Sequence, residues 1–241
     1  MLSTHCSNGS VFMDNRWLVL GGWSLLPDIL HPIFGNNAYY VDINYIINQL
    51  IDTNNALKSS WHSQLCDSIL NQTGGSFCGI AGWSTGAFCA YSLRQKFPQL
   101  PTILISAAPS FCTRENFPYG QNPSVVKIMR RQLQRNASAV LKSFWQQCGI
   151  PNDYPLTTTD YSVDALCAGL LFLEQVSLLP LTKTDSPLHL FHGTDDSVIP
   201  IDGARLFEEA GAAVHYYSGN HVFFLESNAQ RDIKECCNIC V

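Results

Sequence analysis

The chain has 241 residues, of which 46% are hydrophobic and 14% charged, and its formal net charge is −5. This length is enough for one large domain with a well-buried core, and the composition is typical of a globular protein. The acidic balance argues against nucleic acid as the main partner, and no apolar run is long enough to cross a membrane. No basic stretch precedes an apolar block at the N-terminus, so we expect no signal peptide and a cytoplasmic protein. We also expect a monomer.

Ten cysteines are scattered irregularly from Cys6 to Cys240. This scatter does not resemble a disulfide scaffold, and several of the thiols lie in apolar runs where cysteine acts as a small hydrophobe. The tail with Cys236, Cys237 and Cys240 can bind metal or oxidise, but no second ligand pair stands at zinc-site spacing. We therefore expect reduced thiols, no metal and no organic cofactor.

Short apolar runs alternate with helical patterns along most of the chain. We expect strands at residues 17–20, 39–42, 77–81, 102–106, 188–192 and 213–217, and helices within 45–70 and at 87–97. This alternation predicts a single α/β domain over residues 1–241 with a mostly parallel, doubly wound sheet. Residues 110–187 lack strand signals and read as helical, so we expect a helical cap over the carboxyl edge of the sheet, where such folds place their sites.

The most informative run is Gly82-Trp83-Ser84-Thr85-Gly86, directly after an apolar strand pattern. It has the form of the nucleophile elbow of α/β-hydrolases, in which a sharp turn between strand and helix exposes a serine. Only small residues fit beside such a turn, and Gly82 and Gly86 supply that room. A serine placed in this way attacks carbonyl carbons, so the run predicts an ester, thioester or amide hydrolase.

A serine nucleophile needs a base, and the base needs an orienting acid. Asp195 and Asp196 follow one late strand pattern and His221 follows the last one, in the chain order that α/β-hydrolases use. Spacing favours Asp196 as the acid, with Asp195 as the alternative. Each feature alone has an ordinary structural explanation, but their joint order favours a triad of Ser84, Asp196 and His221. We interpret His192, inside a strand run, as structural.

The oxyanion hole of such a site takes two backbone N–H groups. One is expected from Thr85, directly after the nucleophile. The other is expected from the loop after the first strand, where Gly21 and Gly22 precede Trp23. We therefore predict Trp23 as the second donor, with its indole ring lining the substrate pocket.

Residues 116–152 contain no Asp or Glu but carry five of the 14 basic residues of the chain, namely Lys127, Arg130, Arg131, Arg135 and Lys142. At 100° per residue the first four of these fall on one side of a helix, and Val125, Val126, Met129 and Leu133 fall on the other. A solvated helix face is the ordinary explanation, but such faces usually mix both signs. A patch of one sign beside an active site favours an acidic partner or substrate.

Taken together, these motifs resemble the BioH-type pimeloyl-[acyl-carrier protein] methyl ester esterases of biotin synthesis. The similarity lies in residues 18–23, the elbow 82–86, residues 110–112, 142–144 and 169–173, and the segments around Asp196 and His221. Two departures are that the usual His-Gly-Trp is Gly21-Gly22-Trp23 here, and that Asp42-Ile43-Asn44-Tyr45 replaces a glycine-rich loop.

The resemblance implies an α/β-hydrolase fold with Ser84, Asp196 and His221 as catalytic triad and with Trp23 and Thr85 as oxyanion donors. It implies that Phe144 is an aromatic lid residue that lines the acyl channel. It also implies that cap cations hold the acyl-carrier protein, for which Arg130, Arg131, Arg135 and Lys142 are the inferred equivalents. The alternatives are a general short-chain carboxylesterase or acyl thioesterase, and a non-catalytic binding protein on a hydrolase scaffold.

Overall fold

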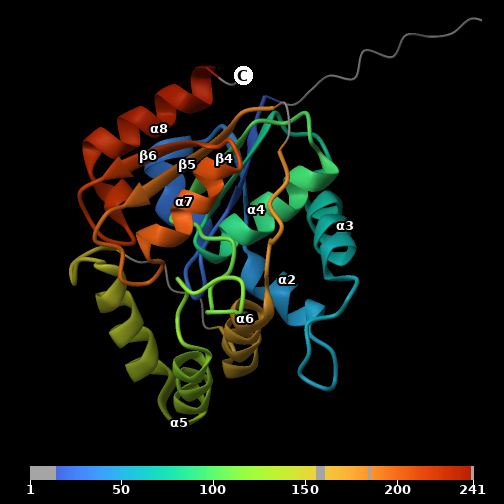
Figure 1. Cartoon of the computed structure of the whole chain (residues 1–241), viewed down its shortest axis with the longest axis vertical. Helices are drawn as coiled ribbons and strands as arrows, with labels where there is room; N and C mark the ends of the chain where they lie inside the picture. The colour runs from blue at the N-terminus through green and yellow to red at the C-terminus, as the bar shows by residue number, and fades with distance from the viewer. Residues whose placement is uncertain (1–14, 156–160, 184–185, 240–241) are drawn as a thin grey trace, which may run out of the picture.

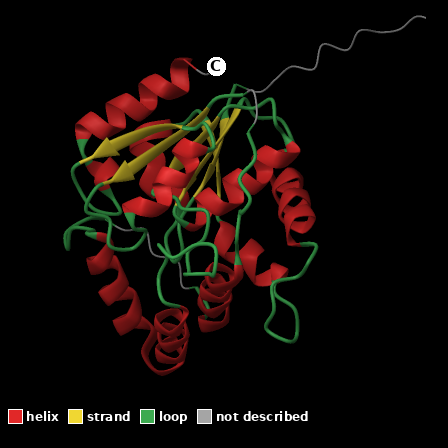
Figure 2. Ribbon diagram, viewed as in Figure 1, coloured by secondary structure: helices red, strands yellow, loops and turns green. Residues whose placement is uncertain are grey.

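Six short strands form one sheet in the computed structural model, which describes residues 15–155, 161–183 and 186–239 (Figures 1 and 2). The strands are β1 (Trp17–Leu20), β2 (Ala38–Val41), β3 (Gly79–Trp83), β4 (Thr102–Ile105), β5 (Leu188–Gly193) and β6 (Ala213–Tyr217). Their order is β2-β1-β3-β4-β5-β6, and every neighbouring pair is parallel. The predicted parallel α/β sheet is therefore confirmed.

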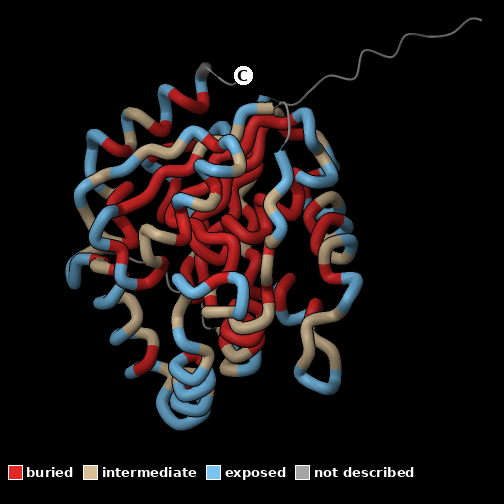
Figure 3. Tube along the Cα trace, viewed as in Figure 1, coloured by how far each residue is buried: buried red, intermediate tan, exposed pale blue. Residues whose placement is uncertain are grey.

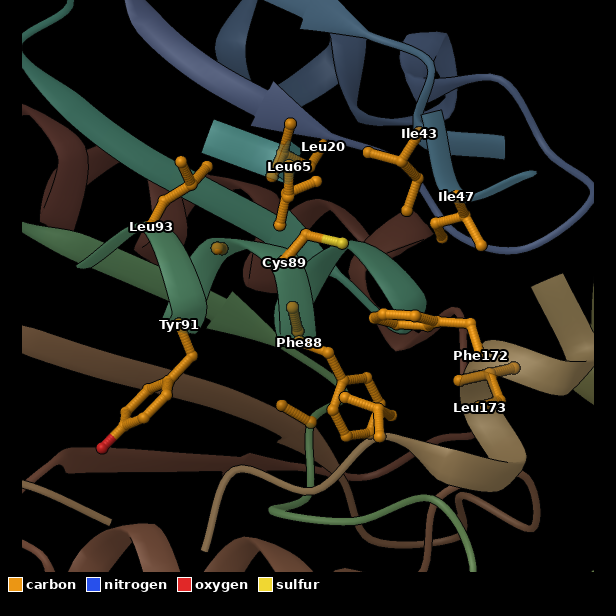
Figure 4. Packing of buried hydrophobic residues seen from close by; sticks show 14 of the residues in the cluster. Leu20, Ile43, Ile47, Leu65, Phe88, Cys89, Tyr91, Leu93, Phe172 and Leu173 are labelled. Atoms are coloured by element: carbon orange, nitrogen blue, oxygen red, sulfur yellow. The ribbon is translucent and has the colours of Figure 1, made fainter. Parts of the chain in front are cut away.

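Helices cover both faces of this sheet because its strands are apolar on both sides. Along β1, Leu18 packs into one buried cluster with α2 (Ile43–Leu50), α3 (Trp61–Thr73) and α4 (Thr85–Lys96). Val19 points the other way, into a second cluster with α1 (His31–Phe34) and α8 (Ser227–Ile239). Figure 4 shows side chains of β1, α2, α3, α4 and α6 (Val163–Gln175) meeting in the first cluster. Two 3₁₀ helices, Pro27–Leu30 and Phe223–Leu225, and α7 (Ile201–Glu209) complete this layer structure.

The elbow strand and its helix lie closer to the serine than the sequence predicted. β3 runs from Gly79 to Trp83 rather than over 77–81, because Gly82 and Trp83 pair with Leu104 and Ile105 of β4. The following helix begins at Thr85 rather than at residue 87. Ser84 is thus the single residue between a strand and a helix, which makes the turn as short as it can be.

Two helices from the predicted cap stretch lie at the end of the molecule opposite α8 (Figure 1). α5 (Pro123–Cys148) is long and bends at Asn136, whose φ of −158° and ψ of 83° are not helical. The Asn136 side chain accepts a hydrogen bond from the backbone N–H of Ala139 and so caps the second half of the helix. α6 packs against α5 and α2. Figure 3 shows that much of α5 is exposed while the centre of the molecule, which holds the buried strands β1, β3 and β4, is not.

Candidate active site

The backbone at Ser84 is strained, as the elbow motif requires. Its φ is 55° and its ψ is −118°, a region that non-glycine residues rarely adopt and that costs about 1–3 kcal/mol. A Cβ on Gly82 would lie 2.2 Å from the carbonyl oxygen of Gly86, and one on Gly86 would lie 2.4 Å from that of Leu20. Both glycines are therefore needed for the close approach of β3, α4 and the end of β1.

The structure brings Ser84, His221 and Asp196 into one hydrogen-bonded chain. His221 Nε2 is 2.9 Å from Ser84 Oγ, and His221 Nδ1 is 2.8 Å from Asp196 Oδ2. A carboxylate can only accept, so the imidazole carries its proton on Nδ1 and accepts the Ser84 hydroxyl at Nε2. All three residues are at most 6% exposed. This arrangement can transfer a proton from the serine to the histidine.

The loop after β5 holds the Asp196 carboxylate in place. Its Oδ1 accepts hydrogen bonds of 2.9 Å from the backbone N–H groups of Val198 and Ile199. Burial raises the pKa of Asp196, but the imidazoles of His221 and His192 and the backbone N–H of Ile199 together outweigh burial and keep this pKa below its ordinary value. Asp195 is exposed and accepts instead from the backbone N–H of Gly219 at 3.2 Å. Of the two predicted alternatives, only Asp196 contacts the histidine.

Two contacts that the sequence analysis missed hold the backbone of His221. Its carbonyl oxygen accepts hydrogen bonds from the indole Nε1 of Trp83 and from the hydroxyl of Ser106, both at 3.1 Å. Trp83 lies inside the elbow motif and Ser106 directly follows β4, so both residues stand at strand ends beside the site. No sequence pattern signals that they reach a residue more than 100 positions later.

His192 is buried beside the same acid and supports its loop. Its Nε2 donates to the carbonyl oxygen of Ile199 at 2.9 Å and lies 3.9 Å from Asp196 Oδ2. Burial lowers the pKa of His192, so its imidazole stays neutral at physiological pH. These contacts agree with the structural role that we expected for His192.

The loop after β1 packs directly on the elbow. A Cβ on Gly22 would lie 2.9 Å from the ring of Trp83, so the loop backbone rests on the indole face. Trp23 is buried, donates from Nε1 to the carbonyl oxygen of Leu166 at 2.9 Å, and meets Phe144 edge-on with ring centroids 4.9 Å apart. Thr85 is the first residue of α4, and N–H groups in a first helical turn have no partner within the helix. The oxyanion roles of Trp23 and Thr85 stay predictions.

A narrow cavity of about 50 Å³ opens from Ser84 toward α5 and α6. The lining includes both residues predicted for substrate binding, Trp23 and Phe144. The other lining residues are Phe111, Gln121, Val125, Val126, Met129, Gln147, Leu170, Leu173 and Val198. None of these side chains carries a charge, so the cavity suits an uncharged and mostly apolar group.

The basic residues of α5 do not form one uniform patch. Arg130 pairs with Glu174 of α6 at 3.3 Å, and Lys127 pairs with the same carboxylate at 3.4 Å. Arg131, Arg135 and Lys142 are exposed, and within the described ranges no carboxylate lies at ion-pair distance from them. Arg130 and Arg131 also border a groove of about 510 Å³ that contains Asp52 and Asp164, so both signs of charge occur there.

One part of the predicted α5 face is wrong. Val126, Met129 and Leu133 pack inward as expected, but Val125 is 55% exposed. The reason is that α5 lies at the edge of the molecule, so only a narrow stripe along the helix packs against other elements. Val125 instead borders the mouth of the cavity above Ser84.

Among residues 15–155, 161–183 and 186–239, no cluster of three or more His, Cys, Asp or Glu side chains is arranged to hold a metal ion. Within the same ranges, no helix combines the length and the hydropathy that crossing a bilayer takes.

Comparison with known proteins gives a consistent picture of the fold. No family model matches the chain. A curated relative, the pimeloyl-[acyl-carrier protein] methyl ester esterase of Nitrosomonas europaea, is 24% identical over 165 residues. The aligned region is 61% of this chain and 63% of that esterase, so the chain spans somewhat less than two thirds of its curated relative.

Solved structures match over nearly the whole chain. An esterase from Exiguobacterium antarcticum has a TM-score of 0.72 at 16% identity, covering 94% of this chain and 92% of its own. A hydrolase from Oleispira antarctica has a TM-score of 0.70 at 10% identity, covering 93% and 91%. An enol-lactonase from Burkholderia xenovorans has a TM-score of 0.65 at 14% identity, covering 93% and 90%. The chain thus has the α/β-hydrolase fold, and the curated relative supports its resemblance to the pimeloyl methyl ester esterases.

Proposed function

We propose that the protein is a serine hydrolase that cleaves carboxylic esters. The observation that carries this proposal is the buried chain from Ser84 Oγ through His221 to Asp196, with links of 2.9 and 2.8 Å, at a serine in strained elbow geometry. A nucleophile, a base and an orienting acid in hydrogen-bond reach are what acyl transfer through serine requires.

In the proposed reaction His221 Nε2 takes the proton of Ser84 as Oγ attacks the ester carbonyl carbon. The resulting oxyanion accepts hydrogen bonds from the backbone N–H groups of Trp23 and Thr85. The imidazolium, stabilised by the Asp196 carboxylate, then gives its proton to the leaving alkoxide, which departs as the alcohol. A water molecule, deprotonated by the same imidazole, hydrolyses the acyl-enzyme and releases the carboxylic acid. No metal or organic cofactor takes part in these steps.

For the substrate, we propose the methyl ester of pimeloyl-acyl-carrier protein, an intermediate of biotin biosynthesis. The curated relative carries this activity in its name. An uncharged, slender acyl chain suits the narrow apolar cavity beside Trp23 and Phe144. The exposed cations Arg131, Arg135 and Lys142 on α5 suit an acidic carrier protein, whereas Arg130 already forms an ion pair with Glu174.

The first test is complementation of a bacterial strain that lacks its own pimeloyl ester esterase, grown without biotin. We expect the wild-type chain to restore growth and the Ser84→Ala variant, produced at the same level, to fail. Purified protein is assayed in parallel with a fluorophosphonate probe and with short p-nitrophenyl esters.

The outcomes of these assays separate the alternatives. Probe labelling and small-ester hydrolysis without complementation would replace the biotin assignment by a general carboxylesterase or thioesterase. Absence of labelling at Ser84 would leave a binding protein on a hydrolase scaffold.

A further inference from the structure

Few side chains within the loop that carries Trp23 restrict its backbone conformation. Gly21 and Gly22 lack side chains, and Ser24 has a φ of 62°. Such a loop needs outside contacts to hold one orientation of each peptide group. The orientation of the peptide between Gly22 and Trp23 matters most, because it carries one of the two proposed oxyanion donors.

Asn44, in the first turn of α2, supplies two such contacts to the loop backbone, one on each side of Trp23. Its Oδ1 accepts a hydrogen bond from the backbone N–H of Ser24 at 3.1 Å. Its Nδ2 donates to the carbonyl oxygen of Gly22 at 3.3 Å. Asn44 is only 1% exposed, so water does not compete for these bonds.

The hydrogen bond to the Gly22 carbonyl also sets the direction in which the Trp23 N–H points. A trans peptide group is planar, and its C=O and N–H point in opposite directions. The bond that draws the Gly22 carbonyl toward Asn44 therefore directs the Trp23 N–H away from Asn44. Since the loop backbone lies between α2 and the elbow, where Gly22 rests on the ring of Trp83, this direction is toward the side of Ser84.

A second set of contacts fixes the Asn44 side chain itself. Asp42 Oδ1 accepts from both the backbone N–H and the Nδ2 of Asn44, each at 2.9 Å. The Tyr161 hydroxyl donates to Asp42 Oδ2 at 2.9 Å and lies 3.3 Å from Asn44 Nδ2, whose two hydrogens are shared among Asp42, Gly22 and Tyr161. The Asp42 carboxylate can only accept hydrogen bonds, so the part of the Asn44 side chain that faces it must be the NH₂ group. The amide oxygen Oδ1 then faces the backbone N–H of Ser24.

We propose that Asn44 is a positioning residue of the oxyanion hole: it clasps the loop at Gly22 and Ser24 so that the Trp23 N–H faces the reacting carbonyl. This inference rests on the proposed ester hydrolysis at Ser84. Asn44 touches neither the substrate nor Ser84, and it acts only through the loop.

The test compares Asn44→Leu and Asn44→Asp with the wild type on a short p-nitrophenyl ester. Leucine has a similar size but makes neither bond, while aspartate keeps an acceptor for Ser24 and loses the donor to Gly22. We expect kcat to fall about 10- to 100-fold, less than the ~10²–10³-fold loss from removing an oxyanion donor outright. KM should change less than about threefold, because the ground-state carbonyl depends little on this hole.

A trifluoromethyl ketone gives the decisive second reading, because it adds to the serine as a tetrahedral oxyanion. Its affinity should fall in both variants by the same factor as kcat/KM. Asn48→Leu is the matched control: it makes the same substitution at an exposed position of α2 that does not contact the loop, so kcat should stay within about threefold of the wild type.

Unchanged kcat in both folded variants would overturn the inference. A fall in kcat with unchanged affinity for the ketone would also overturn it, because a loss of oxyanion stabilisation must weaken the ketone adduct as well. Thermal unfolding identifies a variant that fails to fold, and the test then rests on the variant that does fold. If the wild type hydrolyses no ester and takes up no fluorophosphonate, the proposed function fails first, and the role of Asn44 with it.

Discussion

Asp195 and Asp196 are neighbours with the same side chain, yet the loop after β5 gives them opposite environments. Asp196 is buried against His221 and two backbone N–H groups, while Asp195 faces solvent beside Gly219. Chemical identity therefore says nothing about which carboxylate orients the imidazole, and geometry decides it.

Replacing each carboxylate by an amide tests this difference. Asp196→Asn places a group that can donate against His221 Nδ1, which favours the wrong tautomer, and should lower kcat by about 10⁴-fold. Asp195→Asn is the matched control and should keep kcat within a few-fold of the wild type. The measurement is ester hydrolysis at pH 7–8 with folding checked by circular dichroism; equal losses in the two variants would contradict the assignment.

Asp196 also makes a prediction for acid stability. Its pKa is lower in the folded protein than in the unfolded chain, where it is about 3.9. The unfolded state therefore binds the proton more readily, and the stabilisation is present above about pH 4 and lost as the pH falls through the folded pKa. Urea unfolding between pH 2.5 and 7 should show a shallower loss below about pH 4 in Asp196→Asn than in the wild type. Parallel curves would contradict it.

Single residues were predictable where a local motif marks them. Ser84 stands in a glycine-flanked elbow, and His221 follows the last strand, so both could be named from the sequence. Asn44, Trp83 and Ser106 could not, because their partners lie 20 to more than 130 positions away and only the assembled sheet brings them together.

Between elements, α4 lies in close backbone contact with β1 and β3 at the elbow. An added methyl group at Gly86 would have to displace backbone of Leu20 and Gly21, which cannot move without breaking the sheet. Backbone contacts of this kind are rigid, so the cost of a larger residue is not relieved by side-chain motion.

Gly86→Ala should therefore destabilise the protein by clearly more than the roughly 1–2 kcal/mol that a left-handed glycine costs when replaced by alanine. Gly74→Ala provides that reference, because Gly74 has a φ of 70° and open space around its Cβ position. Urea unfolding of both variants is the measurement. Equal midpoints would show that the close approach at the elbow contributes nothing beyond backbone conformation.

The bend of α5 at Asn136 is a second feature at this scale. Asn136→Ala removes the cap of the second half of α5 and should cost about 0.5–2 kcal/mol of stability. It should also lower esterase activity, because this half carries Phe144 to the ring of Trp23. Asn122→Ala, which removes the cap at the start of α5, should cost similar stability with little effect on activity. Equal activities in the two variants would contradict a role for the bend.

Strands were predictable from the sequence where almost all of their residues are apolar. The buried strands β1, β3 and β4 are continuous apolar runs, and all six strands were predicted close to their observed bounds. The end of β3 and the start of α4 were misplaced because pairing with β4, rather than local preference, extends the strand to Trp83. The exposure of Val125 was missed because helical periodicity says nothing about how wide a packing surface the helix will find.

At the scale of the whole molecule, reversing surface charges should affect the hydrolysis of a carrier-bound substrate and of a small substrate differently. Glu-for-cation reversal at Arg131, Arg135 and Lys142 together changes the net charge from −5 to −11. We expect this triple variant to raise KM for acyl-carrier substrate at least about tenfold at low salt, since repulsion slows encounter. Hydrolysis of a p-nitrophenyl ester should stay unchanged.

The matched control reverses the exposed cations of α7 and α8, which are Arg205, Arg231 and Lys234. It gives the same net charge of −11 through helices that lie away from α5 (Figure 1). If both triple variants weaken carrier-bound substrate equally, net charge alone is responsible and α5 is not a docking surface.

The overall architecture followed from the alternation of strands and helices, but the substrate cavity did not. Its walls combine Val126 and Phe144 of α5, Leu170 of α6 and Val198 of the acid loop. Three segments that pack together only in the folded protein set its width, so acyl preference has no local signature in the sequence.

The hydrogen bonds between the loop after β1 and the helices α5 and α6 have a consequence for engineering. Trp145 donates to the hydroxyl of Ser24 at 3.1 Å, and Trp23 donates to the carbonyl of Leu166. The helices that line the cavity beside Ser84 thus also hold the loop with the proposed oxyanion donor. Grafting this helical region from another hydrolase is therefore expected to change turnover together with substrate selectivity.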